Sequence, residues 1–331
     1  MPLWKGDTKM RWIIILMVLL FLPSAAHGLN VVVSLPDFET IVKEVGGNDI
    51  NTSVILPPGA DPHSFSLTPD DVERIKKADL IVLANSNLLS YEQEIIKNYN
   101  GNYVDFDDYA AHGATLKNFG DFDSNPHGYW MDVNNSIAIA KAIAVKLGEV
   151  DAERKEVFES NLNYFTKSMR DAQNVSIEMA KEKGIYGKRV VAMVPGVCYI
   201  ANNLGMNADE ILLTEGSANV DIQKLQRVKE GLREGEYIMI LVPEFLKDAK
   251  AGEMAHQIAV DTNSTIAYVR FAIGGESFSG IFYHNAMEIV SARGSSTISE
   301  KNVSWFIALI ASLIVLSLIE GFLIYECRRS K

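Results

Sequence analysis

Two Pro-His pairs are the residues of this chain best suited to do chemistry. Pro62-His63 lies in the run Pro57–Pro69 (PPGADPHSFSLTP), and Pro126-His127 lies in the run Asn125–Trp130 (NPHGYW). Proline fixes its own φ angle and restricts the residue before it, so each histidine is expected on a stiff turn. A neutral imidazole nitrogen is a ligand that zinc and other transition metals favour. Two such rings on rigid turns indicate a site for a divalent metal.

The elements that must position these rings read as two copies of one architecture. Apolar, β-branched runs cover residues 30–35, 52–56, 80–84 and 103–106 in the first half, and 189–194, 210–214, 237–242 and 265–269 in the second. Helical segments separate them. Runs that are apolar throughout and alternate with helices are typical of parallel sheets covered on both faces. We therefore predict an α/β protein with two four-stranded parallel lobes.

One long helix is expected between the lobes. The segment Ala152–Lys183 contains neither glycine nor proline, and its apolar side chains recur at spacings of four and three residues. Asp151 is a suitable cap at one end, and Gly184 ends the pattern at the other. About 32 residues at roughly 1.5 Å each give a helix of about 48 Å. Such a strut should allow only small rocking of the lobes.

The histidines then fall on loops of the first lobe. His63 is expected after the second strand, before a helix capped by Thr68 with Pro69 at its first position. His127 is expected between the fourth strand and a helix starting near Val133. Both loops follow carboxyl ends of strands, where open α/β sheets bind ligands. On these residues alone, metal binding and ordinary packing are equally open readings.

Both ends of the chain predict a membrane protein facing outward. Basic residues, an apolar run and small residues make 1–28 an export signal. The run Trp305–Tyr325 carries only Glu320 as a charge and is long enough to cross a hydrocarbon core of about 30 Å. Arg328, Arg329 and Lys331 follow it, which places the tail in the cytoplasm. We expect a single-pass protein of the cell membrane with most of the chain extracytoplasmic.

This layout divides the chain into seven parts. They are a signal peptide (1–28), an N-terminal α/β lobe (29–150), the bridging helix (151–184), a C-terminal α/β lobe (185–293), a linker (294–304), a transmembrane helix (305–325) and a cytoplasmic tail (326–331). Cys198 and Cys327 fall on opposite sides of the membrane, so they cannot pair within one chain. The exterior part is large enough to be stable without a disulfide.

Charge and motifs exclude two functional classes. The chain has 42 acidic against 31 basic residues, a net charge of −11, which makes nucleic acid an unsuitable partner. No Ser/His/Asp order, Gly-rich phosphate loop or His-Glu-x-x-His motif is present in the sequence. We therefore do not expect an enzyme. The acidic stretch 105–125, which contains one histidine, is expected to be a solvated loop.

Three runs of this sequence resemble a known family. They are Gly59–Pro69, Ala78–Val82 shortly after it, and Asn125–Asp132. The family comprises the extracytoplasmic zinc- and manganese-binding components of ABC importers, the cluster A-I solute-binding proteins, and the resemblance covers residues 29–293. It implies two α/β lobes bridged by one long helix and capture of a divalent transition metal between them, with His63 and His127 as ligands. It also implies delivery of the metal to a membrane permease and its ATPase.

The second lobe departs from the family pattern at two positions. The resemblance implies a His or Glu ligand five residues before Tyr199, where this chain has Val194. It implies an Asp ligand after the last strand, where Arg270 and Phe271 stand. All three are expected to line the cleft. Two imidazoles and water make a weaker, less selective site than four protein ligands. Zinc is the first expectation, manganese the second, and no metal at all stays open.

Several residues are alternatives for the lost ligands. Cys198 would be a strong soft ligand if its thiolate faced the cleft. Glu244 ends a strand of the second lobe and has a carboxylate to offer, while Glu276 and His112 lie in stretches that would have to fold inward. Each also has an ordinary structural reading, as a small buried residue for Cys198 and as a solvated residue for the others.

Two functions of different class therefore stay open. The first is a membrane-anchored solute-binding protein of a divalent-metal ABC importer with an altered second lobe. The second is a repurposed scaffold that serves as an anion-binding, adhesion or sensory ectodomain. The histidine turns favour the first. Val194 and the Arg270-Phe271 pair favour the second, and the cationic side chain of Arg270 would suit an anion or an anionic chelate.

Overall fold

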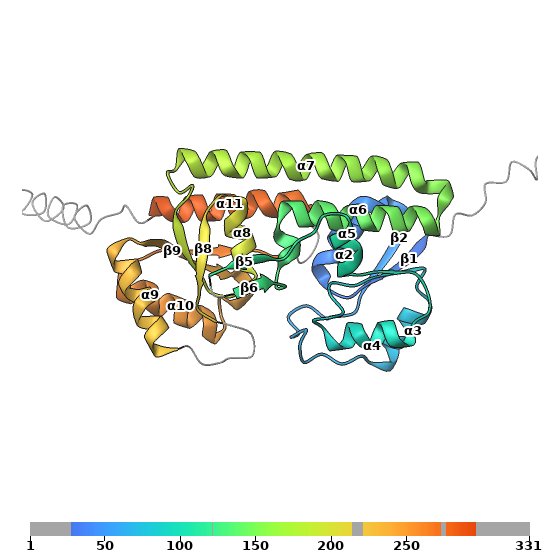
Figure 1. Ribbon diagram of the computed structural model, residues 1–331, viewed down its shortest axis with the longest axis horizontal. Helices are drawn as coiled ribbons and strands as arrows, with labels where there is room; N and C mark the ends of the chain where they lie inside the picture. The colour runs from blue at the N-terminus through green and yellow to red at the C-terminus, as the bar shows by residue number, and fades with distance from the viewer. Residues whose placement is uncertain (1–27, 121, 214–220, 273–275, 296–331) are drawn as a thin grey trace, which may run out of the picture.

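The computed structural model describes residues 28–120, 122–213, 221–272 and 276–295 (Figure 1). The predicted transmembrane helix and cytoplasmic tail lie outside these residues, as does the predicted signal peptide up to residue 27 and most of the linker. Within the described ranges, no helix is long and apolar enough to cross a bilayer.

The first lobe is built on a parallel sheet with the strand order β2-β1-β3-β4. The strands are β1 (Leu29–Val33), β2 (Ile50–Val54), β3 (Leu80–Val82) and β4 (Tyr103–Val104). Val31 of β1 pairs with Thr52 on one side and Leu80 on the other. The predicted parallel strands are confirmed here. The helices of this lobe are α2 (Pro36–Gly46), α3 (Pro69–Lys76), α4 (Ser90–Asn98), α5 (Phe106–Ala111) and α6 (Val133–Val150), with 3-10 turns η1 (Gly47–Asp49) and η2 (Tyr129–Met131).

The second lobe repeats this topology. Its parallel sheet has the order β10-β9-β7-β8, with β7 (Arg189–Ala192), β8 (Asn207–Ile211), β9 (Tyr237–Pro243) and β10 (Ile266–Val269). If the four strands are numbered within each lobe, both sheets have the order 2-1-3-4. The remaining elements are α8 (Val197–Asn203), α9 (Ile222–Glu234), η4 (Glu244–Leu246), α10 (Lys250–Thr262) and α11 (Phe278–Ser295). The prediction of two copies of one α/β architecture is correct.

The predicted long helix is present as α7 (Lys155–Glu182), preceded by the 3-10 turn η3 (Ala152–Arg154). Its 28 residues run along both lobes (Figure 1). It contacts α2 and α6 of the first lobe and α11 of the second. The buried face of α7 includes Phe158, Phe165, Met169, Ala172 and Ser176. This face matches the predicted apolar stripe.

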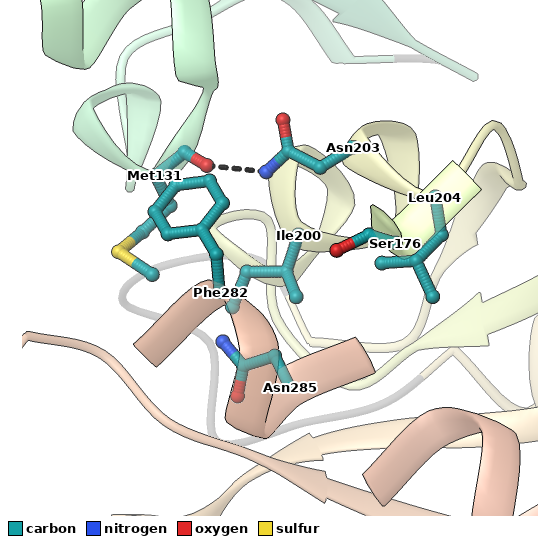
Figure 2. Close-up of a pocket in the computed structure, with 7 residues that line it drawn as sticks. All are labelled: Met131, Ser176, Ile200, Asn203, Leu204, Phe282 and Asn285. Atoms are coloured by element: carbon teal, nitrogen blue, oxygen red, sulfur yellow. Dashed lines mark hydrogen bonds between the residues drawn. The ribbon is translucent and has the colours of Figure 1, made fainter. Parts of the chain in front are cut away.

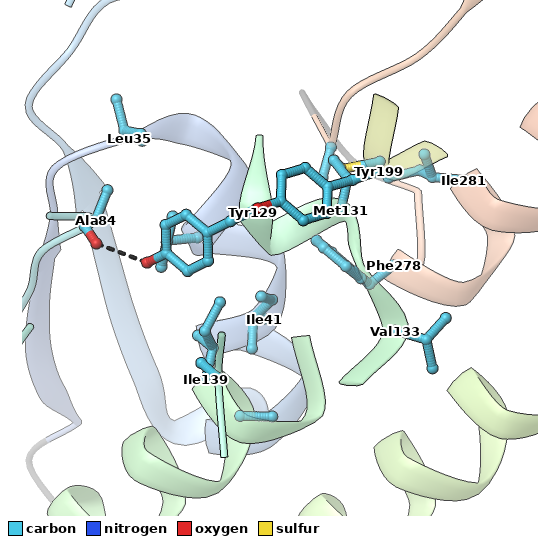
Figure 3. Close-up of a cluster of buried hydrophobic side chains, with 14 of the residues drawn as sticks. Leu35, Ile41, Ala84, Tyr129, Met131, Val133, Ile139, Tyr199, Phe278 and Ile281 are labelled. Carbon is cyan, nitrogen blue, oxygen red and sulfur yellow. Dashed lines mark hydrogen bonds between the residues drawn. The ribbon is translucent and has the colours of Figure 1, made fainter. Parts of the chain in front are cut away.

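One hydrophobic core spans the two lobes, and a smaller cluster lies within the second lobe. A single cluster of buried side chains contains residues of the first lobe together with Tyr199 of α8 and Phe278 and Ile281 of α11 (Figure 3). Polar contacts reinforce it. The backbone N–H of Ala272 donates to the buried Asp37 carboxylate over 2.8 Å, and that of Phe278 donates to Glu44. Large separation of the lobes would therefore expose apolar surface to water.

The expectation that residues 105–125 form a solvated loop is wrong. The stretch contains helix α5 and an antiparallel hairpin of β5 (Lys117–Phe119) and β6 (Phe122–Asn125). Asp105, only 8% exposed, caps α5 and also accepts from the Ser86 backbone N–H over 3.0 Å. The hairpin packs on the second lobe, since the Lys117 backbone N–H donates to the Tyr199 hydroxyl over 2.9 Å. Tertiary contacts of this kind can stabilise strands where the local sequence signal for a strand is weak.

Candidate metal centre

His63 lies on the loop between β2 and α3, as predicted. Its backbone N–H donates to Asp61 Oδ1 over 3.0 Å, and the Ser64 hydroxyl donates to Asp61 Oδ2 over 3.0 Å. The loop then enters α3 through a reciprocal cap, in which Asp71 N–H donates to Thr68 Oγ1 and Thr68 N–H donates to Asp71 Oδ2. These local bonds fix the turn that carries the exposed imidazole.

His127 follows the hairpin strand β6, so the predicted direct connection from the fourth strand is incorrect. Its backbone N–H donates to Asn125 Oδ1 over 3.0 Å. Asn125 is fully buried, and its amide donates over 2.9 Å to the carbonyl oxygen of Pro195 in the second lobe. The His127 ring is half-buried and meets the Phe122 ring edge-on at 5.6 Å. The loop of His127 is therefore tied to both lobes.

The structure brings the two imidazoles together. Their ring centroids lie 5.7 Å apart with an interplanar angle of 64°. Two imidazoles on one zinc ion, with Zn–N bonds of about 2.0–2.1 Å, have ring centres on the order of 5 Å apart. The observed separation of the ring centroids is close to this value. Metal binding by this pair stays a prediction, and the separation of the two rings is compatible with it.

No third protein ligand joins the pair in the described residues. Across residues 28–120, 122–213, 221–272 and 276–295, no group of three or more His, Cys, Asp or Glu side chains is arranged to hold a metal. Cys198, Glu244, Glu276 and His112 are thus not gathered around His63 and His127. Among the His, Cys, Asp and Glu residues that the structure describes, the candidate donors brought together here are the two imidazoles.

Cys198 lies on α8, within the hydrophobic core, and does not present a ligand to the cleft. Its side chain is fully buried. Burial raises the pKa of the Cys198 thiol to about 12. This cysteine is therefore protonated at neutral pH. Since the thiolate is the form that binds metals, Cys198 behaves as a small apolar residue and not as a ligand.

Glu244 and Arg270 form an ion pair at the carboxyl ends of β9 and β10. Arg270 Nη2 lies 3.3 Å from Glu244 Oε1, and Arg270 Nε donates to the other oxygen of the same carboxylate. Arg270 Nη1 also lies 3.4 Å from Glu276 Oε1. The hydrogen bond from Arg270, together with its charge, lowers the pKa of Glu244. The carboxylate proposed to replace a ligand is therefore already bound by a guanidinium.

The other two cleft positions are apolar. Val194 and Phe271 are half-buried and pack against the shared core. The Phe271 ring lies against Gly128, the residue after His127, and against Gly196, and it meets Phe245 edge-on at 5.9 Å. Phe271, rather than Arg270, is thus the residue that faces the histidine loop.

A seam of hydrogen bonds that the sequence did not reveal joins α8 to the histidine loop. The Tyr199 hydroxyl donates to the Asn125 carbonyl over 2.6 Å. The Asn203 amide donates to the Met131 carbonyl over 2.6 Å, and its oxygen accepts from the Val133 N–H over 3.2 Å. The one available signal was Asn125 itself, because asparagine before a proline favours a side-chain-capped turn.

The cavity between α7, α8, α11 and η2 is too small to be a solute site. Ser176, Asn203, Phe282 and other side chains surround it, and Figure 2 shows the Asn203 amide donating to Met131. Its volume is about 10 Å³. A space of this size holds about one water molecule. The histidine pair, not this cavity, is the candidate site.

Gly128 offers a test of how tightly the lobes must meet at His127. Its φ is +67°, and an added Cβ would lie 2.7 Å from Gly196 Cα. We expect Gly128→Ala to lower the free energy of unfolding by about 1–3 kcal/mol through strain and overlap. It should also weaken metal binding, because His127 moves with the loop. Urea unfolding and zinc titration measure the two effects.

Gly184→Ala is the matched control for this substitution. Gly184 has a φ of +66°, and nothing lies within 4 Å of an added Cβ. The control carries the same backbone strain without the overlap. If both variants lose equal stability and bind zinc equally well, close contact of the lobes at Gly128 does not matter.

The chain is similar to known proteins in both sequence and fold. Residues 31–292 match the family model of ZnuA, the periplasmic component A of the zinc-uptake complex. The chain is 26% identical over 281 residues to the metal ABC transporter substrate-binding lipoprotein FimA of Streptococcus parasanguinis, an alignment that covers 80% of this chain and 88% of FimA.

Solved structures share the fold. A crystal structure of ZnuA matches with a TM-score of 0.67 at 19% identity, over 80% of this chain and 99% of that chain. A manganese-bound periplasmic metal-binding protein of Candidatus Liberibacter asiaticus matches with a TM-score of 0.65 at 16% identity, over 80% and 99%. At these identities the likeness concerns the fold alone.

Proposed function

Because this chain belongs to the ZnuA family, the cluster A-I solute-binding components of metal ABC importers, we propose that it captures a divalent transition metal through His63 and His127. The metal is its cargo, which it passes to a membrane permease powered by an ATPase. The observation that carries the proposal is the 5.7 Å separation of the two imidazole rings. The chain performs no catalytic step in this role.

The donor set favours zinc over manganese as cargo. Imidazole nitrogen suits zinc, whereas carboxylate, carbonyl and water oxygens suit manganese. The two protein donors proposed here are both imidazoles, and Glu244 is engaged by Arg270. Two protein ligands imply weaker binding than a four-ligand zinc site. Such affinity suits a carrier that must release its metal.

The proposed location is outside the cell membrane, next to the permease. Residues 305–325 would serve as a transmembrane anchor and residues 326–331 as the cytoplasmic tail. The related FimA is a lipoprotein, which would be a different kind of anchor. The alternative function as an anion-binding or adhesion scaffold is not favoured, because the charge of Arg270 is already met by two carboxylates.

Zinc titration of the purified full-length chain in detergent tests this proposal. We expect one zinc ion per chain, and X-ray absorption at the zinc edge should show two imidazoles in the first shell. Manganese should bind more weakly. A protein that takes up neither metal at millimolar concentration would refute the proposal.

A further inference from the structure

The second lobe carries a cluster of Arg270, Glu244 and Glu276, and the residue after Arg270, Phe271, contacts the loop of His127. We propose that Arg270 sets the metal affinity of the site, because its guanidinium occupies Glu244 and Glu276 and keeps them from completing the coordination begun by the histidines. The inference rests on the proposed function. It assigns Arg270 as an affinity-determining residue rather than a ligand.

Strand register places this cluster. Val269, at the end of β10, pairs with Pro243, at the end of β9. Arg270 and Glu244 are the next residues, so they emerge side by side from the carboxyl edge of the second sheet. The backbone of Arg270 is held by Asn285, which accepts from its N–H over 2.7 Å and donates to its carbonyl over 2.8 Å. These two bonds fix the backbone position from which the Arg270 side chain extends.

The same edge faces the histidine loop of the first lobe. The residues after Glu244 and Arg270 are Phe245 and Phe271, whose rings meet at 5.9 Å. Phe271 touches Gly128, which directly follows His127. The ion pair and the aromatic pair thus lie next to each other, and the aromatic pair contacts the loop that carries one imidazole.

A guanidinium in this place opposes a cation in two ways. Its positive charge repels a divalent ion, and partial exposure to water reduces this effect without removing it. It also bonds two carboxylates, the oxygen ligands that a metal would otherwise take. Removing the guanidinium should therefore raise metal affinity, and the gain should depend on Glu244.

Arg270→Gln removes the charge and is the central variant. Measured by zinc titration of the full-length chain, its affinity should rise at least tenfold. The double variant Arg270→Gln, Glu244→Gln should lose most of this gain, and Arg270→Lys, which keeps the charge, should stay close to wild type. X-ray absorption should show an added oxygen ligand only in Arg270→Gln. Thermal unfolding checks that each variant is folded.

Arg189→Gln is a matched control in the same lobe. Arg189 lies at the amino end of β7 and is also paired with two carboxylates, Asp209 and Glu236. Its side chain is 36% exposed, against 38% for Arg270. The control makes the same change of charge at the opposite end of the sheet, so its zinc affinity should be that of wild type.

The outcomes separate this inference from the proposed function. Equal zinc affinity of Arg270→Gln and Arg189→Gln overturns the role of Arg270 and leaves the importer proposal standing. A gain in zinc affinity in Arg270→Gln that persists in the double variant Arg270→Gln, Glu244→Gln also overturns it. Failure of every variant to bind zinc refutes both. Binding by Arg270→Gln alone supports the inference while refuting metal capture by the natural chain.

Discussion

Replacing His63 with alanine is expected to lower zinc affinity on the order of 100-fold or more, and His127→Ala should have a similar effect. The reason is that each variant leaves one imidazole where the structure places two at 5.7 Å. Even outer partners of metal ligands contribute about 10–100-fold to affinity, so a direct ligand should contribute at least as much. Competition titration with a zinc chelator measures the change.

His256→Ala is the control for this experiment. His256 lies exposed on α10 of the second lobe, so its removal changes the histidine content without altering the site. It should bind zinc as wild type does. If His63→Ala retains the affinity of His256→Ala, the imidazole pair is not the metal site, and its proximity is only packing.

Phe278→Ala should produce the largest loss of stability, about 3–5 kcal/mol, as is typical of phenylalanine deletions in cores. Phe278 is fully buried and lies 6.0 Å from the Phe165 ring of α7 and 5.7 Å from that of Phe282. It belongs to the core that both lobes share (Figure 3). Truncation therefore leaves a cavity that the strut and both lobes line, where collapse is difficult.

Urea unfolding measures this effect against Tyr164→Ala. Tyr164 lies on α7 but is 74% exposed, so its truncation should cost no more than about 0.5 kcal/mol. Comparison of the two variants separates the loss of a buried aromatic side chain from the loss of an exposed one on the neighbouring helix α7. A loss below about 1 kcal/mol for Phe278→Ala would contradict the shared core.

The architecture was predictable because its signals are long and periodic. The apolar stripe of α7 and the apolar strands of both sheets appear directly in the sequence, and burial then does what the pattern predicts. The hairpin of β5 and β6 was missed because its strands are short and rich in polar residues. Bonds to Tyr199, far away in the sequence, hold it in place.

The candidate site was predictable in its first half only. Proline turns and strand order indicated that His63 and His127 would lie near one another, and they do. The fate of Cys198 depended on which face of α8 is buried, and a helix with buried residues nearly throughout gives no periodic hint. The pairing of Arg270 with Glu244 depended on the neighbour relation of β9 and β10, which only the assembled sheet defines.

The core that joins Phe278 to the first lobe also has a consequence for how the chain matures. Ala272 and Phe278 bond to Asp37 and Glu44, and the first of these contacts spans 235 positions. Contacts between such distant positions form late and slow folding. The part of the core that Phe278 completes can therefore form only after α11 has been made. Until α11 is available to pack, the apolar faces of α7 and of the first lobe that it covers should stay exposed to water.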